Sequence, residues 1–182
     1  RYALPAPVTP PETRPIVVGA GPAGLFAALV LARCGARPIL LERGRRVEQR
    51  QQDVARFWCG GPLDTESNVQ FGEGGAGAFS DGKLNTGTRD VRHRFIMEQL
   101  VSCGAPADIL TDAKPHVGTD KLHIALQCLR RQLLEAGADI RFGARLDGLT
   151  VQDGVLTAVT VRQGDTLYTL PARQVILAPG HS

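Results

Sequence analysis

The sequence predicts an α/β fold, in which a Rossmann-like parallel sheet carries helices and is joined by an antiparallel β-meander. Three observations favour it. An apolar run at 16–18 leads into Gly19-Ala20-Gly21-Pro22-Ala23-Gly24 and then into an apolar helical stretch. A second apolar run follows and ends in an acidic residue, so strand, glycine turn, helix, strand and acid fit within about 30 residues. Three alternating apolar runs near the C-terminus, separated by glycine-containing turns, are typical of a meander.

Each small residue of the glycine turn has a physical reason. Gly19 permits the tight turn off the first strand, and Gly21 lets the backbone approach a pyrophosphate closely. Gly24 allows the helix to pack against the strand, and Pro22 stands where a missing N–H costs nothing. The helix that begins at about Ala23 then offers N–H groups and a partial positive charge to phosphates. The turn is therefore predicted to bind a dinucleotide.

The second strand is predicted at 38–41 and ends in Glu42. Glu42 is placed to accept hydrogen bonds from a ribose diol, and an acid there disfavours a ribose 2′-phosphate and hence NADP. A lone G-x-G-x-x-G motif is weak evidence, and an ordinary glycine-rich turn is the alternative. The strand, the helix, the spacing and the acid together favour nucleotide binding.

Composition argues against several classes of function. The formal net charge of the 182 residues is +3 and the basic residues are scattered, so no nucleic-acid partner is expected. The longest apolar run, 25–32, is too short to span a bilayer, so no membrane partner is expected. The cysteines form no C-x-x-C pair, which argues against a zinc or dithiol centre and fits a cytoplasmic protein. Neither end resembles a natural terminus, and we expect a piece of a longer polypeptide.

The chain divides into a Pro-rich linker at 1–15, a nucleotide-binding domain at 16–58 and 117–182, and an inserted segment at 59–116. The helix at 47–58 is predicted to bury Val47 and Val54 and to expose the polar row 49–52. The other predicted elements are a helix at 90–103 capped by Asp90, a helix from 119 to 136 capped by Thr119 or Asp120, strands at 139–142, 146–151, 155–161 and 166–170, and a buried parallel strand at 174–178.

Glycine is dense in the long segment 59–87, and loops of this length tend to be functional or disordered. Residues 77–83 spell G-x-x-x-x-G-K, but Leu84 replaces the hydroxyl that would hold magnesium, so a P-loop is not expected. The favoured interpretation is a backbone wrap around a flat or anionic ligand, to which Lys83 supplies a charge. A flexible lid without contacts is the alternative.

The layout favours a flavin over a nicotinamide nucleotide. About a hundred residues separate Glu42 from the strand at 139–142, whereas a plain doubly wound domain needs one short crossover. The connection to the final strand is a β-meander and not a helix. Both features resemble the FAD-binding fold of the glutathione-reductase superfamily, in which the turn after the last strand passes the dinucleotide, as Ala178-Pro179-Gly180 would here.

Two further motifs are more specific: NVQFGEGGAGAFSDGKLNT at 68–86 and KPHVGTDKL at 114–122, with VILAPGHS at the end. Together they resemble a largely uncharacterised family of bacterial-type FAD-dependent dehydrogenases. In such relatives the glycine-rich stretch lies along the flavin. The later Gly-Asp element that closes over the ribityl chain is absent here, so the rest of the polypeptide is expected to complete the flavin pocket. The resemblance implies flavin contacts from Gly74, Gly75, Ala76, Ser80 and Lys83, adenosine contact from Arg43, and adenine contact near Leu146.

The sequence predicts no function for the remaining candidate residues. The four histidines, His93, His116, His123 and His181, show no metal-ligand spacing, so no metal is expected, and His123 is predicted on the surface. Cys59 is predicted to be a small buried residue. No catalytic residue is assigned.

The sequence therefore predicts the FAD-binding core of an oxidoreductase, a dehydrogenase in which hydride passes through flavin N5. The partner is a small-molecule substrate or an electron donor, with NAD(P)H as a candidate donor. The alternative is a non-catalytic FAD- or NAD-binding module with a structural or regulatory nucleotide. An NAD-dependent dehydrogenase domain is disfavoured by the insertion and the meander.

Overall fold

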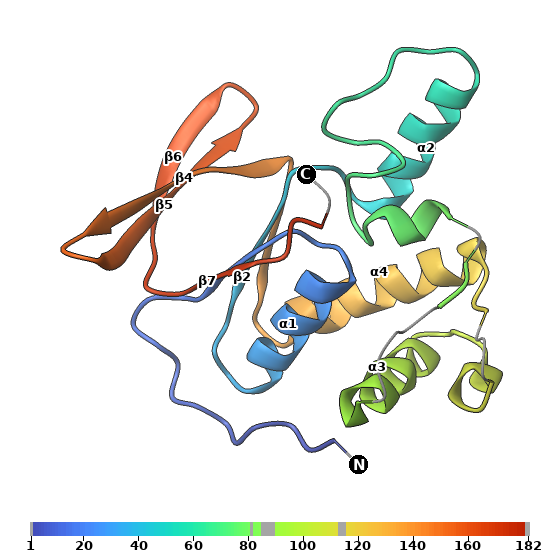
Figure 1. Ribbon diagram of the computed structural model, residues 1–182, viewed down its shortest axis with the longest axis horizontal. Coiled ribbons are helices and arrows are strands. Elements are labelled where there is room, and N and C mark those ends of the chain that lie inside the picture. The colour runs from blue at the N-terminus through green and yellow to red at the C-terminus, as the bar shows by residue number, and fades with distance from the viewer. Residues whose placement is uncertain (1, 81, 85–89, 113–115, 181–182) are drawn as a thin grey trace.

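A parallel sheet and an antiparallel sheet organise the molecule in the computed structural model, which describes residues 2–80, 82–84, 90–112 and 116–180 (Figure 1). The parallel sheet has the strand order β3-β2-β1-β7. Its strands are β1 (Ile16–Val18), β2 (Ile39–Glu42), β3 (Asp139–Phe142) and β7 (Val175–Leu177). All three pairings are parallel, with Val17 opposite Leu40 and Ile176. The predicted α/β fold class is confirmed.

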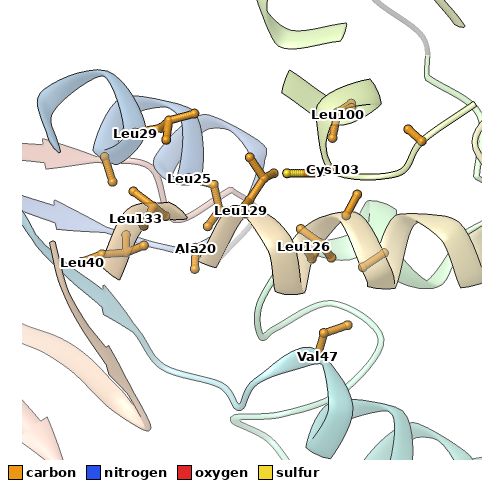
Figure 2. Packing of buried hydrophobic residues seen from close by; sticks show 14 of the residues in the cluster. Ala20, Leu25, Leu29, Leu40, Val47, Leu100, Cys103, Leu126, Leu129 and Leu133 are labelled. Carbon is orange, nitrogen blue, oxygen red and sulfur yellow. The ribbon is translucent and has the colours of Figure 1, made fainter. Parts of the chain in front are cut away.

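Alternation along the central strands sends neighbouring residues into two different cores. Val17 and Leu40 pack against helices α1 (Pro22–Arg33) and α4 (Thr119–Glu135), on one face of the sheet. Figure 2 shows Leu25 and Leu29 of α1 close to Leu129 and Leu133 of α4. The opposite face contributes Ile16, Ile39 and Leu41 to a smaller core with the antiparallel sheet. The molecule is therefore layered as helices, parallel sheet and antiparallel sheet.

The antiparallel sheet is the predicted meander. It consists of β4 (Ala144–Gln152), β5 (Val155–Gln163) and β6 (Thr166–Pro171), in that order. Asp153 and Gly154 join β4 to β5 with φ values of 50° and 76°. Positive φ at both central positions is the requirement of a tight hairpin turn, and Asp-Gly meets it at low cost.

The remaining helices surround α4. They are α2 (Val47–Trp58), α3 (Val91–Ser102) and the short 3-10 helices η1 (Ala76–Phe79) and η2 (Ala107–Leu110). Asp90 caps α3 as predicted, since its carboxylate accepts from the Arg92 N–H at 2.8 Å. The predicted cap of α4 by Thr119 or Asp120 is wrong. Gly118, with φ of 79°, stands at the N-cap because the chain before it pairs with residues 82–84, where the Val117 N–H donates to the Gly82 carbonyl at 2.9 Å.

Two segments at the edge of the fold differ from expectation. The chain before Pro15 is extended as predicted, but it packs on the helices: the Val8 N–H donates to the Cys34 carbonyl at 2.8 Å, and the Tyr2 ring contacts Phe95. Strand β7 is parallel as predicted but not buried, since Leu177 is 59% exposed. Among the described strands β7 lies at the sheet edge, and this position leaves its side chains uncovered.

Arg50 was placed by its sequence in an exposed polar row, and this prediction is wrong. Its side chain is 0% exposed and lies over the Phe79 ring, 4.5 Å from the ring centroid. The loop after α2 has no strand ladder, so its carbonyls need other donors, and the guanidinium supplies five N–H groups in a rigid fork. The acceptors are the carbonyl oxygens of Asn68, Val69, Gly72, Glu73 and Gly75, at 2.7, 2.9, 3.4, 2.8 and 2.8 Å.

Arg50 thereby orders the long glycine-rich segment. Gly72 makes room for it: a Cβ on Gly72 would lie 2.5 Å from Arg50 Cδ. Burial lowers the pKa of Arg50 to about 10, with Glu42 and Glu73 acting in the opposite direction, so the guanidinium stays charged at neutral pH. The alternative of a lid without contacts does not hold for the part of this segment that Arg50 contacts, residues 68–75.

Arg50→Lys should destabilise the protein by about 3–5 kcal/mol, because a buried charge keeps its cost while most of its acceptors lose their donor. Chemical denaturation measures the free energy of unfolding. Gln52→Lys, an exposed position on the same helix, is the control and should change stability by no more than about 0.5 kcal/mol. Equal stability of the two variants would contradict a structural role for the guanidinium.

Candidate functional site

A cleft of about 430 Å³ lies where the parallel strands β1, β2 and β7 end and helix α1 begins. Open α/β sheets bind ligands at this edge, beyond the carboxyl ends of the strands. The structure brings most of the predicted contact residues together here. The cleft wall contains Gly19, Gly21, Pro22, Ala23, Glu42, Arg43, Gly75, Ala76, Leu146, Ala178 and Gly180.

Four predicted contact residues lie outside the cleft wall. Gly24 is buried in the packing of α1 on the glycine turn, where a Cβ would lie 1.8 Å from the Gly19 carbonyl oxygen. Gly74 and Lys83 line a second cavity next to the cleft. The Ser80 hydroxyl donates to the Gly77 carbonyl at 3.0 Å. These residues belong to the surroundings of the cleft.

The glycines of the turn serve two different purposes. A Cβ on Gly19 would lie 2.3 Å from the Ala178 carbonyl oxygen, so the protein's own packing requires glycine there. A Cβ on Gly21 would meet nothing nearer than Gly75 Cα at 3.9 Å, although Gly21 lines the cleft. The protein's own packing therefore does not require glycine at position 21, whereas a diphosphate bound against the backbone would. The turn thus fits the phosphate-binding role.

The carboxylate of Glu42 accepts hydrogen bonds from two backbone N–H groups, one of them in the glycine turn. Its Oε2 accepts from the Ala20 N–H at 2.7 Å and its Oε1 from the Gly44 N–H at 2.8 Å, and the residue is 5% exposed in the cleft wall. Each carboxylate oxygen has a further lone pair, so Glu42 can still accept from a ribose hydroxyl. The sequence did not indicate that the same side chain would tie the second strand to the glycine turn.

A pair of arginines borders the end of the cleft nearest the antiparallel sheet. Arg43 lies over the Phe71 ring, 4.2 Å from its centroid, and its Nε donates to Glu66 at 2.7 Å. Arg145 of β4 donates to the other oxygen of Glu66 at 3.1 Å. The hydrogen bond from Arg43 lowers the pKa of Glu66, which keeps this bridge ionised. Sequence reasoning missed Glu66, Phe71 and Arg145, because only the folded chain brings them together.

Behind the cleft, Glu73 connects the glycine-rich loop to α2 and α4. Its Oε2 accepts from the Val47 N–H at 2.8 Å and from Arg130 at 2.6 Å, and the residue is 0% exposed. Its Oε1 has no hydrogen-bond partner among the described residues. Burial raises the pKa of Glu73 to about 7. The next residue, Gly74, donates its N–H to the Ala20 carbonyl at 2.8 Å and so joins the loop to the glycine turn.

Two predictions about single side chains are wrong. His123 is not on the surface: it is 6% exposed, its Nε2 contacts the Ala78 carbonyl at 2.7 Å, and its Nδ1 contacts the Gln51 amide nitrogen at 2.6 Å. Because a carbonyl oxygen can only accept, Nε2 carries a proton and donates to Ala78. Cys59 is exposed, because the chain leaves α2 at this point toward solvent. His181 lies outside the described residues.

In the described part of the chain, no group of three or more His, Cys, Asp or Glu side chains could hold a metal ion. None of the described helices combines the length and the apolar composition that crossing a membrane requires.

Comparison with known sequences points to FAD. Residues 12–53 match the FAD binding domain family, over the strand, turn and helix that form the cleft. An uncharacterised protein of Clostridium beijerinckii is 46% identical over 171 residues, which are 94% of this chain and 31% of that protein. Protein FixC of Escherichia coli K12 is 32% identical over 169 residues, which are 91% of this chain and 36% of FixC. The chain thus spans about a third of the length of these curated relatives.

Solved structures agree on the fold. THI4 of Thermovibrio ammonificans has a TM-score of 0.57 at 19% identity, covering 93% of this chain and 58% of that one. The 3-ketosteroid-Δ4-(5α)-dehydrogenase of Rhodococcus jostii RHA1 has a TM-score of 0.55 at 17% identity, covering 96% of this chain and 48% of that one. At these identities the likeness concerns the fold alone. The family match supports FAD as the nucleotide.

Gly21→Val should abolish retention of FAD by the full-length protein, because the added methyl groups occupy the space that the diphosphate needs against the backbone. The flavin content of the purified protein, read from its visible absorption, measures this. Gly148→Val is the matched control in β4, away from the cleft, and should retain FAD. Unchanged flavin content in Gly21→Val would count against the site.

The ionisation of Glu73 should be visible in the dependence of the unfolding free energy on pH. A carboxyl whose pKa is raised from 4.5 to about 7 on folding stabilises the protein fully below pH 4.5, and that contribution is lost as the pH rises through 7. Between pH 5 and pH 8 the loss should be about 2 kcal/mol. Unfolding free energies at both pH values, compared with those of Glu73→Gln, isolate this contribution. The variant should show a smaller decrease, and an equal decrease in both proteins would contradict the assignment.

Proposed function

We propose that this chain is the FAD-binding core of a flavin-dependent oxidoreductase, a dehydrogenase of the glutathione-reductase-like superfamily. The observation that carries the proposal is the glycine turn. The wall at Gly21 leaves the room that a diphosphate requires, and the FAD binding domain family matches over the same residues. The motifs at 68–86 and 114–122 resemble those of a largely uncharacterised family of FAD-dependent dehydrogenases, and this resemblance supports the same function.

Different residues of the cleft would bind different parts of the nucleotide. The N–H groups at the start of α1, from Gly21 onward, would bind the diphosphate with the help of the helix dipole. Glu42 would accept from the ribose diol, and Arg43 and the backbone near Leu146 would enclose the adenosine. The backbone at Gly75 would lie along the part of FAD that connects the diphosphate to the flavin ring. FAD, when bound, would supply hydride transfer at its N5 atom, with a small-molecule substrate or NAD(P)H as the other reactant.

The rest of the polypeptide has a part in this proposal. The curated relatives extend well beyond the matched region, and we propose that the corresponding part of this protein completes the flavin pocket and the substrate site. We also propose a cytoplasmic protein without nucleic-acid or membrane partners, on the strength of its scattered charge and unpaired cysteines.

One observation favours the alternative, a module in which the nucleotide is structural or regulatory. Among the described residues of the cleft wall, the carboxylate of Glu42 is already bonded to two backbone amides, and the other charged side chains are arginines. Acid–base catalysis needs a side chain that can gain or lose a proton near neutral pH. The described residues of this wall would bind and orient a nucleotide. A side chain that transfers protons in an enzymatic reaction would have to come from elsewhere in the protein.

The absorption spectrum of the purified full-length protein tests the proposal. Flavin bands that bleach when NADH, NADPH or a substrate is added anaerobically are the expected result, because the oxidised ring then accepts hydride. Bands that no donor bleaches would favour the structural module. A colourless protein that binds NAD would overturn the assignment of FAD.

A further inference from the structure

A second cavity, of about 610 Å³, lies beside the cleft, and the bound nucleotide proposed above does not occupy it. It is lined by residues of α1, α3, α4 and the glycine-rich segment. Its wall is mostly apolar and includes Leu25, Phe26, Ile96, Met97, Leu126 and Leu129. The volume falls within the range of small-molecule sites, which are apolar with a few placed polar groups. We call this cavity the apolar chamber.

One buried polar atom of a residue that lines the chamber lacks a partner. His93, on the first turn of α3, lines the chamber, and its Nε2 is buried without a hydrogen bond to any described residue. The neighbouring carboxylate of Asp90 is already engaged by the backbone N–H and the guanidinium of Arg92, at 2.7–2.8 Å. Buried polar atoms without partners are rare in folded proteins, and each calls for an explanation. An oxygen atom on a ligand in the chamber would provide one once the His93 ring turns toward that ligand.

The chamber adjoins the nucleotide cleft directly. Pro22 and Ala23, at the start of α1, line both cavities. Gly74 lines the chamber, and the next residue, Gly75, lines the cleft. A molecule in the chamber would therefore rest against the same helix terminus and the same loop as the cofactor.

The chamber also explains why the two specific motifs occur together. Lys83 of the first motif lines the chamber and forms an antiparallel bridge with His116 of the second. A Cβ on Gly82 would lie 2.8 Å from Gly118, so the two backbones are in close contact. The chamber wall thus combines Lys83 of the first motif with Leu122 of the second, which are distant in sequence.

We propose that the apolar chamber binds the substrate, an apolar ring or chain that carries one hydroxyl or carbonyl oxygen, with that oxygen hydrogen-bonded to His93 Nε2. The aliphatic and aromatic wall selects the apolar body, and His93 selects the oxygen. The term substrate rests on the proposed function, whereas the binding itself does not require a flavin.

A matched pair of probes tests the role of His93: 2-naphthol and naphthalene, which differ by one hydroxyl. Equilibrium dialysis against the full-length protein should show that both bind and that 2-naphthol binds about five- to tenfold more tightly, as one hydrogen bond predicts. His93→Leu should remove this preference and His93→Gln should keep most of it, because glutamine retains a donor and an acceptor. No binding by the wild type, or an unchanged preference in His93→Leu, would overturn the proposal.

A second pair of variants tests the place of binding. Met97→Trp should fill the chamber and weaken both probes at least tenfold without loss of FAD, whereas Ile124→Trp, 58% exposed on α4, should change neither. Loss of FAD from a folded Met97→Trp protein would place the flavin in the chamber and overturn the proposal. If Met97→Trp does not fold, the His93 variants still decide. A flavin-free wild type that binds 2-naphthol would contradict the proposed function and support the chamber.

Discussion

The charged side chain of Arg50 inside the glycine-rich loop is the interaction on which the rest of the site depends. A long segment without helix or strand must satisfy its carbonyls in some other way, and the guanidinium does so from within. The cost of burying the charge is offset by these bonds and by the nearby carboxylates of Glu42 and Glu73. With the loop held in this way, Phe71 and Gly75 form a defined wall of the cleft.

The electrostatics of the cleft suit an anion flanked by a nucleoside. The start of α1 presents a partial positive charge in the middle, and Arg43 and Arg145, joined through Glu66, stand at the end next to the antiparallel sheet. Glu42 supplies the one carboxylate among the described residues of the wall, and backbone N–H groups hold it in place. A diphosphate with an adenosine on one side matches this distribution of charge.

The cleft and the apolar chamber meet at the first turn of α1, so a single structural element borders both. This arrangement sets the cleft, into which the start of α1 and two arginines face, beside the apolar chamber. Reactions in which a bound nucleotide exchanges electrons with an apolar compound need this kind of juxtaposition, since the two reactants must touch while their environments differ. The bridge between Lys83 and His116 joins the glycine-rich segment, which lines the chamber, to the chain just before α4.

Local patterns in the sequence by themselves determined the glycine turn, helix α1, the strand ending at Glu42 and the meander, because hydrophobic period and turn chemistry act over a few residues. Together with the family resemblance, these patterns also predicted most of the contact residues that the structure places in the cleft wall. Only the tertiary structure decided that Arg50 and His123 are buried, that Gly118 starts α4, and that Glu66 joins two arginines. A polar side chain becomes buried when distant backbone supplies its hydrogen-bond partners, and no local pattern records where that backbone will lie.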